Sequence, residues 1–184
     1  MIDKFLLHFV TLFGVGKLKK APGTIASLIT TLVFYLYFKT IKPLEFISVK
    51  DDLILLLFVL IIASYYAIEK AKSHFKSQDP KEIVIDEVCG QLIPLITIVL
   101  IIGGGLDTYT TLGLASYFLK VNSINMELYI LISFISFRFF DIVKPFPVGY
   151  FDKKYKNSFG ILFDDIVAGI CAAILIAIPL LIAT

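Results

Sequence analysis

The 184-residue sequence contains few of the side chains on which several enzyme classes depend. It has two cysteines, Cys89 and Cys171, and two histidines, His8 and His74. There is no Cys-x-x-Cys pair and both cysteines lie in apolar stretches, so we expect small buried residues rather than a disulfide framework. No arginine follows either cysteine at the Cys-x5-Arg spacing of a thiolate site. Neither histidine is grouped with other catalytic or metal-ligating residues on an apolar face. This argues against a phosphohistidine mechanism, a histidine-rich zinc site and a Ser-His-Asp triad.

Charged residues are also scarce. They make up 17% of the chain against 58% hydrophobic residues, and the mean hydropathy is +0.90, whereas an ordinary domain is about 25% charged and about 45–50% apolar. We therefore expect an integral membrane protein, with a very apolar soluble helical bundle as the alternative. The length predicts one domain over residues 1–184. The net charge of +2 gives no sign of a nucleic-acid partner, and none is predicted.

Apolar runs predict an all-α, membrane-embedded helical bundle with about five spanning segments and one or two short helices. The segments are Ala26–Phe38, Leu53–Ile68, Leu92–Leu106, Glu127–Ile142 and Phe163–Ala183. A helix needs about 20 residues to cross the hydrocarbon core, and only the last segment comfortably has them. The others need flanking residues or cross only partly. Thr108–Leu119 is expected to lie along the surface or to re-enter, and Met1–Phe13 to form an amphipathic helix rather than a signal peptide.

Helix-capping residues predict where some of these segments begin and end. Thr24 is expected to cap the first segment after Pro22-Gly23, and Asp79-Pro80 to open the third. The glycines Gly103-Gly104-Gly105 are expected to end that segment.

The lysines predict an orientation in the membrane. Most of them fall in the N-terminal region and in the connections after the second and fourth segments, and the other turns carry only Lys39, Lys42, Lys50 and Lys120. Basic connections stay in the cytoplasm. The N-terminus is therefore expected inside and the C-terminus outside, and in this topology every acidic motif faces the cytoplasm.

Two pairs of adjacent carboxylates stand at the start of strongly apolar segments. Asp86-Glu87 follows Ile83-Val84-Ile85, and Asp164-Asp165 follows Ile161-Leu162-Phe163. Adjacent ionised carboxylates repel each other, and a membrane boundary partly desolvates them. A divalent metal is the simplest compensating cation. Mg²⁺ suits such a site because it takes one or two carboxylates together with phosphate oxygens and water.

The candidate metal ligands are acids at the ends of these segments, namely Asp79, Asp86, Glu87, Asp164 and Asp165. Asp141 is a further candidate, next in line with Asp79. The alternative is that these acids only cap helix N-termini, where the dipole stabilises negative charge by ~0.3–1 kcal/mol.

Basic residues are expected to hold a phosphate. Arg138 and Asp141 share a helix face at i and i+3, and Lys144 follows just before Pro145-Phe146-Pro147. Arg can fork onto a phosphate, and Lys supplies a compact charge. The alternative is a snorkelling Arg138 that is paired with Asp141 at the interface.

A second basic stretch, Gly14–Ser27, joins a lysine-rich loop to a helix N-terminus. Free backbone N–H groups at such a terminus bind anions, which adds Lys20 and Thr24 to the candidate phosphate-binding residues. The spacing matches neither a Walker loop nor a Rossmann fingerprint. A simple positive-inside flank is the alternative.

Taken together, these residues resemble the phosphatidylglycerophosphatase A family. The Lys-Pro-aromatic-Pro and Asp-Asp-x-x-Ala-Gly blocks are specific, and the Ala-Pro-Gly-Thr block is not. The sequence departs from the family pattern at Asn157-Ser158, where the family usually has two glycines, and at Ala26, where it often has glycine. Four blocks carry the resemblance: Ala21-Pro22-Gly23-Thr24 with Ser27-Leu28; Ile83–Glu87 with Gly90; Phe137-Arg138, Asp141 and Lys144–Pro147; and Gly160-Ile161 with Asp164–Gly169.

The resemblance implies an enzyme, a Mg²⁺-dependent phosphatase that acts on a phospholipid in the membrane. It would hydrolyse phosphatidylglycerophosphate to phosphatidylglycerol and phosphate, in phospholipid biosynthesis, at the cytoplasmic face of a bacterial-type inner membrane. Asp86, Glu87, Asp141, Asp164 and Asp165 would form the catalytic set, with Lys20, Thr24, Arg138 and Lys144 on the substrate. A carboxylate could act as a base or as a covalent nucleophile. The oligomeric state has no signal in the sequence.

Two other functions use similar residues. A small ion-coupled carrier would use the carboxylates as cation sites, but its acids should lie near mid-bilayer rather than at segment ends. A phosphatidyl transferase shares the metal chemistry, yet its Gly-Ala-Arg-rich run with two later aspartates is absent.

Overall fold

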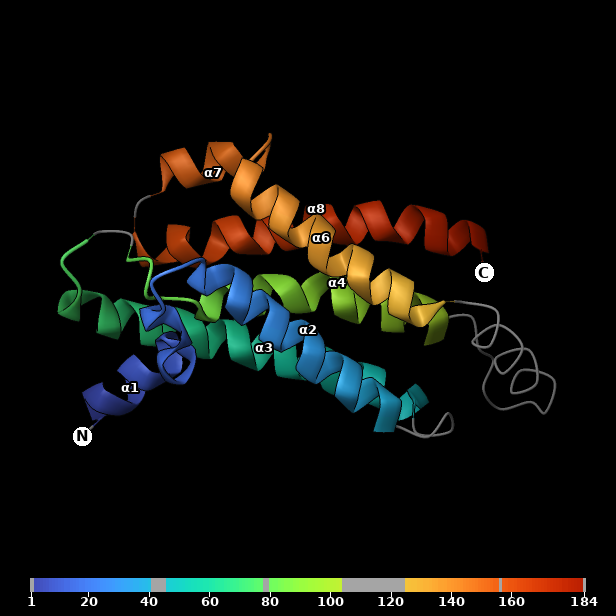
Figure 1. Ribbon diagram of the computed structural model, residues 1–184, viewed down its shortest axis with the longest axis horizontal. Coiled ribbons are helices and arrows are strands. Elements are labelled where there is room, and N and C mark those ends of the chain that lie inside the picture. The colour runs from blue at the N-terminus through green and yellow to red at the C-terminus, as the bar shows by residue number, and fades with distance from the viewer. Residues whose placement is uncertain (1, 41–45, 78–79, 104–124, 156, 184) are drawn as a thin grey trace.

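The computed structural model describes residues 2–40, 46–77, 80–103, 125–155 and 157–183 (Figure 1). Within these residues the regular structure is helical and no strand occurs, which confirms the predicted all-α class. The short elements lie toward one end of the molecule: α1 (Ile2–Val10), η1 (Leu12–Lys17), η2 (Lys72–His74) and α7 (Val148–Lys154). The long helices run roughly along the long axis: α2 (Pro22–Thr40), α3 (Phe46–Ala71), α4 (Ile85–Gly103), α6 (Met126–Val143) and α8 (Ser158–Ala183).

The long helices match the predicted apolar segments closely. Four of the five segments lie entirely inside α2, α3, α6 and α8. The third begins inside α4, which extends to Gly103, the first residue of the glycine run. The last residues of that segment, 104–106, and the predicted surface or re-entrant segment Thr108–Leu119 lie outside the described residues.

The predicted number of membrane spans is not confirmed. Among the described residues, two stretches are long and apolar enough to cross a bilayer, Asp51–His74 and Ser158–Pro179. Helix α6 is interrupted by charge, since Glu127, Arg138 and Asp141 all fall within its 18 residues. Helix length alone is therefore a poor guide to how many of these segments cross completely.

Two predicted helix starts are wrong. Helix α2 begins at Pro22, so Thr24 lies inside its first turn and does not cap it. Proline is favoured at this first position because its missing N–H has no intrahelical partner there. Helix α4 begins at Ile85 rather than at Pro80, because the Val84 N–H donates to the Val10 carbonyl at 2.9 Å and ties the preceding residues to α1. Asp79 lies outside the described residues.

Helix α4 is the centre of the bundle and packs most extensively on α8. The two helices approach closely because glycines face each other across the contact: a Cβ atom at Gly169 would collide with the Gly90 carbonyl. A Cβ atom at Gly90 would lie 2.6 Å from both the Asp165 carbonyl oxygen and Phe137 Cε2. Phe137 of α6 is itself fully buried. This packing brings the first turn of α4 alongside the acids of α8.

The outer faces of the long helices are strongly apolar. Val33, Leu55, Phe58, Ile135 and Ile174 are each between 56% and 61% exposed, and they come from α2, α3, α6 and α8. Soluble monomers rarely expose apolar patches of this extent. These faces favour association with lipid and disfavour the alternative of a soluble bundle.

We expect Gly90→Ala to destabilise the protein by about 1–3 kcal/mol, the usual cost of overpacking a close contact. The added methyl group would press on the Asp165 carbonyl and the Phe137 ring and force α4 away from α8. Thermal unfolding in detergent should therefore show a lower melting temperature. The control is Ile174→Ala on the exposed face of α8, which should change little; an unchanged melting temperature for Gly90→Ala would contradict the packing described here.

Candidate active site

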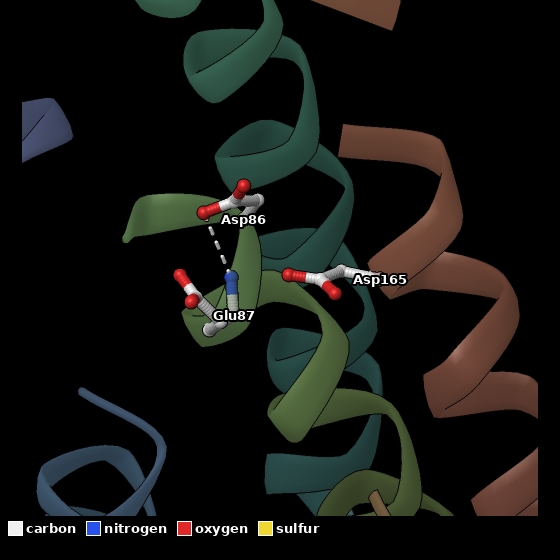
Figure 2. Close-up of side chains that lie close together, drawn as sticks. All are labelled: Asp86, Glu87 and Asp165. Carbon is white, nitrogen blue, oxygen red and sulfur yellow. Dashed lines mark hydrogen bonds between the residues drawn. The ribbon is translucent and has the colours of Figure 1, made fainter. Parts of the chain in front are cut away.

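Three carboxylates from two helices converge at one end of the bundle (Figure 2). Asp86 and Glu87 occupy the first turn of α4 and Asp165 comes from α8, and one oxygen from each lies within 4.8 Å of the others. Asp86 and Asp165 are buried. The Asp86 carboxylate accepts a hydrogen bond from the Glu87 N–H at 3.1 Å, and the positive end of the α4 dipole favours negative charge at this position.

Glu87 is held against the start of α2. A Cβ atom at Gly23 would collide with Glu87 Oε1, so this position admits only glycine without a shift of the carboxylate. The second oxygen, Glu87 Oε2, is buried and has no hydrogen-bond partner among the described residues. Burial raises the pKa of Glu87 to about 7. The pKa of Asp86 is also raised, first by burial and then by the neighbouring Glu87.

Arg138 links this cluster to α2 and to a fourth acid. Its Nη1 lies 2.6 Å from an Asp141 carboxylate oxygen and donates to the Ser27 hydroxyl at 3.3 Å. Its Nε is buried and has no partner within the described part of the chain. The predicted Arg138–Asp141 pair is thus present, and the guanidinium retains donor capacity.

Lys144 is the second cation of the site. Its ammonium group lies 2.6 Å from Asp164 Oδ2 and 2.7 Å from Asp152 Oδ1. Burial lowers its pKa, but the hydrogen bonds to these two carboxylates outweigh burial, so the net pKa is raised and the side chain stays charged. Lys144 follows α6 in the left-handed conformation, at φ 48° and ψ 51°. The chain therefore turns sharply here, which directs α7 and its Asp152 back toward α8.

Asn157 directly precedes α8, the helix that supplies Asp164 and Asp165. Its side-chain oxygen accepts the Gly160 N–H at 2.9 Å, the bond expected of an N-cap residue. The departure from the family pattern at this position therefore supplies a helix cap in this chain.

The charged side chains surround one polar cavity of about 110 Å³. It lies among α4, α6, α7 and α8, and an isolated apolar bundle has no structural need for so many acids there. The residues that line it are Ile83, Asp86, Glu87, Asp141, Lys144, Asp152, Tyr155, Gly160, Ile161, Asp164 and Asp165.

Most of the candidate site residues from the sequence meet at this cavity. Asp86, Glu87, Asp141, Lys144, Asp164 and Asp165 line it, and Arg138 reaches it through Asp141. Asp164 pairs with Lys144 and is not part of the three-carboxylate cluster.

Three other candidates do not reach the cavity. Lys20 is exposed in the loop before α2, and Thr24 is half-buried in the first turn of α2; neither lines the cavity. Asp79 is outside the described residues, so its predicted role as a metal ligand has no structural test.

Sequence reasoning missed four residues of the site. Asp152 and Tyr155 line the cavity, Gly23 gives room to Glu87, and Ser27 accepts from Arg138. Asp152 is an isolated acid directly before Lys153 and Lys154, so the sequence suggested only a basic connection there. Gly23 and Ser27 do belong to a motif that resembles the family, but their contacts depend on how α2 packs.

The fold and the cavity define a helical protein with apolar outer faces and a buried acidic site next to two cations. The family model described as Phosphatidylglycerophosphatase A matches residues 8–180, and the chain belongs to this family. That assignment makes it an enzyme of the lipid-phosphatase class. No solved structure matches the chain.

Three curated relatives align along most of the chain. Phosphatidylglycerophosphatase A of Haemophilus influenzae is 33% identical over 164 residues, which cover 89% of this chain and 82% of the relative. A Bacteroides thetaiotaomicron protein named "Putative phosphatidylinositol-3-phosphatase" is 29% identical over 167 residues, covering 90% and 87%. Phosphatidylglycerophosphatase A of Escherichia coli is 27% identical over 161 residues, covering 88% and 75%.

The burial of Glu87 predicts how stability depends on pH. Its pKa is 4.5 ordinarily and about 7 in the fold, so the folded state binds the proton more tightly than the unfolded state. The stabilisation is fully present below about pH 4.5 and is lost as the pH rises through about 7. In the presence of a chelator, the melting temperature should therefore fall between about pH 5 and pH 8.

The matched variant for this measurement is Glu87→Gln, which cannot ionise. Its melting temperature should depend less steeply on pH, with a remaining slope from the other buried carboxyl groups of the cavity, among them Asp86, whose pKa is raised in the same direction. Equal slopes for the two proteins would show that Glu87 does not titrate in this range.

Proposed function

We propose that this protein hydrolyses the terminal phosphomonoester of phosphatidylglycerophosphate to phosphatidylglycerol and phosphate, with Mg²⁺ as cofactor, in phospholipid biosynthesis. The observation that carries the proposal is the convergence of Asp86, Glu87 and Asp165 in a cavity that also contains Lys144. Family membership and two relatives named phosphatidylglycerophosphatase A support the choice of substrate.

The donor set of the cavity fits a hard divalent ion. All three side chains offer carboxylate oxygens, which are the ligands that Mg²⁺ takes in proteins. The buried Glu87 Oε2, which lacks a partner among the described residues, is a donor atom that such an ion would satisfy. When bound, Mg²⁺ supplies positive charge toward the phosphomonoester and lowers the pKa of water. Asp79, a further predicted ligand, stays a proposal from the sequence alone.

The remaining charged residues bind and position the phosphate. Arg138 lies between Asp141 and Ser27 and can present its guanidinium to phosphate oxygens. Lys144 offers a compact charge inside the cavity, where Asp152 and Asp164 hold its ammonium group in place. One of the cavity carboxylates would act either as a base that takes a proton from the attacking water or as a nucleophile that attacks phosphorus. In both cases the bond from phosphorus to the glycerol oxygen breaks; the covalent acyl phosphate of the second case is then hydrolysed by water.

The proposed setting is a bacterial-type inner membrane, with the whole chain as one multi-pass domain and the cavity facing the cytoplasm. The exposed apolar faces of α2, α3, α6 and α8 support this placement. The lysine distribution supports the orientation, because basic connections and the acidic motifs fall on the same side. We retain the five predicted apolar segments as membrane segments in this proposal, some of which cross only partly.

The direct test is phosphate release by the detergent-purified protein, with Mg²⁺ and with a chelator. We expect Mg²⁺-dependent release from phosphatidylglycerophosphate that is faster than release from phosphatidylinositol 3-phosphate, the type of lipid named for the Bacteroides relative. Faster release from the inositol lipid would overturn the substrate. No release from either lipid by folded protein would overturn the phosphatase and favour the carrier alternative.

Asp165→Asn should lower kcat/KM by roughly 100-fold or more, because loss of a metal-site carboxylate exceeds the roughly 10–100-fold effect of an outer partner. The side chain is buried, and the substitution preserves its shape. The control is Asp51→Asn, an exposed acid of α3 away from the cavity, which should keep full activity. If Asp165→Asn is folded and fully active, Asp165 has no role in the reaction.

The sequence predicts that Lys144 and Lys20 both bind the phosphate, but only Lys144 lines the cavity. Lys144→Gln should lower kcat/KM by about 10- to 100-fold, since a hydrogen bond to a charged group contributes about 1.5–3 kcal/mol. Lys20→Gln should change it by less than about threefold, because Lys20 is exposed and does not line the cavity. Steady-state kinetics on both variants decides between the two sites, and a larger effect at Lys20 would favour the loop before α2 as the phosphate site.

A further inference from the structure

An apolar groove of about 240 Å³ runs between α2 and α6. Leu28, Thr31 and Tyr35 of α2 form one wall, and Ile130, Leu131 and Phe134 of α6 form the other. The acidic cavity does not include these residues. The groove is therefore a separate feature, and its relation to the cavity depends on the residues at its end.

The Arg138–Ser27 pair lies just beyond one end of the groove. Ser27 directly precedes Leu28 on α2, and Arg138 lies one helical turn beyond Phe134 on α6. Residues three or four apart share a helix face, so the α6 stripe that walls the groove continues into Arg138 and then into Asp141. Arg138 donates to Ser27 and pairs with Asp141, which lines the cavity, so the pair lies between the groove and the cavity.

The other end of the groove is polar. Glu127 lines it and pairs with Lys39 at 3.9 Å, with both side chains more than half exposed. From Ser27 to Lys39 the α2 axis rises by about 18 Å at 1.5 Å per residue, which is close to the roughly 15 Å of one leaflet, half of a hydrocarbon core of about 30 Å. The apolar wall from Leu28 to Tyr35 takes up about 10 Å of this length, so the groove accommodates part of one lipid chain between two charged ends.

We propose that the α2–α6 groove holds one acyl chain of the phospholipid substrate while Arg138 holds its phosphate end. This inference rests on the proposed function. A lipid carries its charged headgroup and its chain in one molecule, so a cation one helical turn beyond an apolar groove matches that molecule. A second copy of the chain would match the apolar walls but not their continuity with Arg138.

A second groove supplies the control. It has about 470 Å³ between α2 and α3, and its α2 wall is formed by Ile29, Val33 and Tyr37. Thr30 and Phe34 of α2 also line this groove, whereas no residue of α6 does. Leu131 in the α2–α6 groove and Leu56 in the α2–α3 groove are 53% and 55% exposed. Both grooves are apolar and the two leucines are exposed to a similar degree. A tryptophan at either position therefore obstructs its groove in a comparable way.

The test compares Leu131→Trp with Leu56→Trp on phosphatidylglycerophosphate with long and with six-carbon acyl chains. We expect Leu131→Trp to raise KM for the long-chain lipid by about tenfold (about 1.4 kcal/mol) relative to the short-chain lipid, and Leu56→Trp to leave this ratio at the wild-type value. Equal ratios for the two variants, or a larger change at Leu56, would overturn the groove assignment. If Leu131→Trp does not fold, Leu28→Trp on the opposite wall replaces it.

A binding measurement separates this inference from the proposed reaction. Long-chain phosphatidylglycerophosphate with a photoreactive diazirine in one acyl chain is irradiated with the wild-type protein, and the labelled peptides are identified. Labels on 28–35 and 130–134 support the groove even if no phosphate is released, in which case only the proposed reaction fails. Labels confined to α3, or a detergent-stable dimer that Leu131→Trp dissociates, would overturn it.

Discussion

The burial of carboxylates inside an apolar bundle is the constraint on which the rest of the structure depends. Asp86, Asp164 and Asp165 are all less than 8% exposed, and an ionised carboxylate in such surroundings is costly unless a cation compensates it. Lys144 compensates Asp164, and Arg138 compensates Asp141. No cation among the described residues forms an ion pair with the cluster of Asp86, Glu87 and Asp165. The charge balance within the protein is therefore incomplete at the place where a divalent ion fits.

Small residues determine how closely the helices that carry these charges approach. Gly90 and Gly169 let α4 and α8 pack with their backbones in contact, and Gly23 lets Glu87 lie against the start of α2. The left-handed conformation of Lys144 then directs α7 and Asp152 to the same cavity. Precise placement of charged groups in a low-dielectric site favours catalysis, because the groups need little reorganisation during reaction. The outer faces of the same helices are apolar, so they suit contact with lipid.

Much of this arrangement is predictable from local sequence, and the failures have physical causes. Long apolar runs predict the helices, and the paired acids at the ends of these runs predict which residues line the site cavity. The prediction that Thr24 caps a helix fails because α2 begins at Pro22, and Lys20 remains exposed because its loop does not fold over the cavity. Asp152 was missed because its role depends on a turn at Lys144 that local propensity does not encode. Contacts between distant segments, such as Arg138 with Ser27, need the packing itself.

The most direct test of the account is divalent-metal binding by the cluster of Asp86, Glu87 and Asp165. Mn²⁺ is a paramagnetic substitute for Mg²⁺, and its electron paramagnetic resonance signal distinguishes free from bound ion. The account predicts stoichiometric Mn²⁺ binding by the wild-type protein, displacement by excess Mg²⁺, and loss of binding in folded Glu87→Gln. Mn²⁺ binding that is absent in the wild type, or unchanged in Glu87→Gln, would contradict the claim that these carboxylates form the metal site of the enzyme.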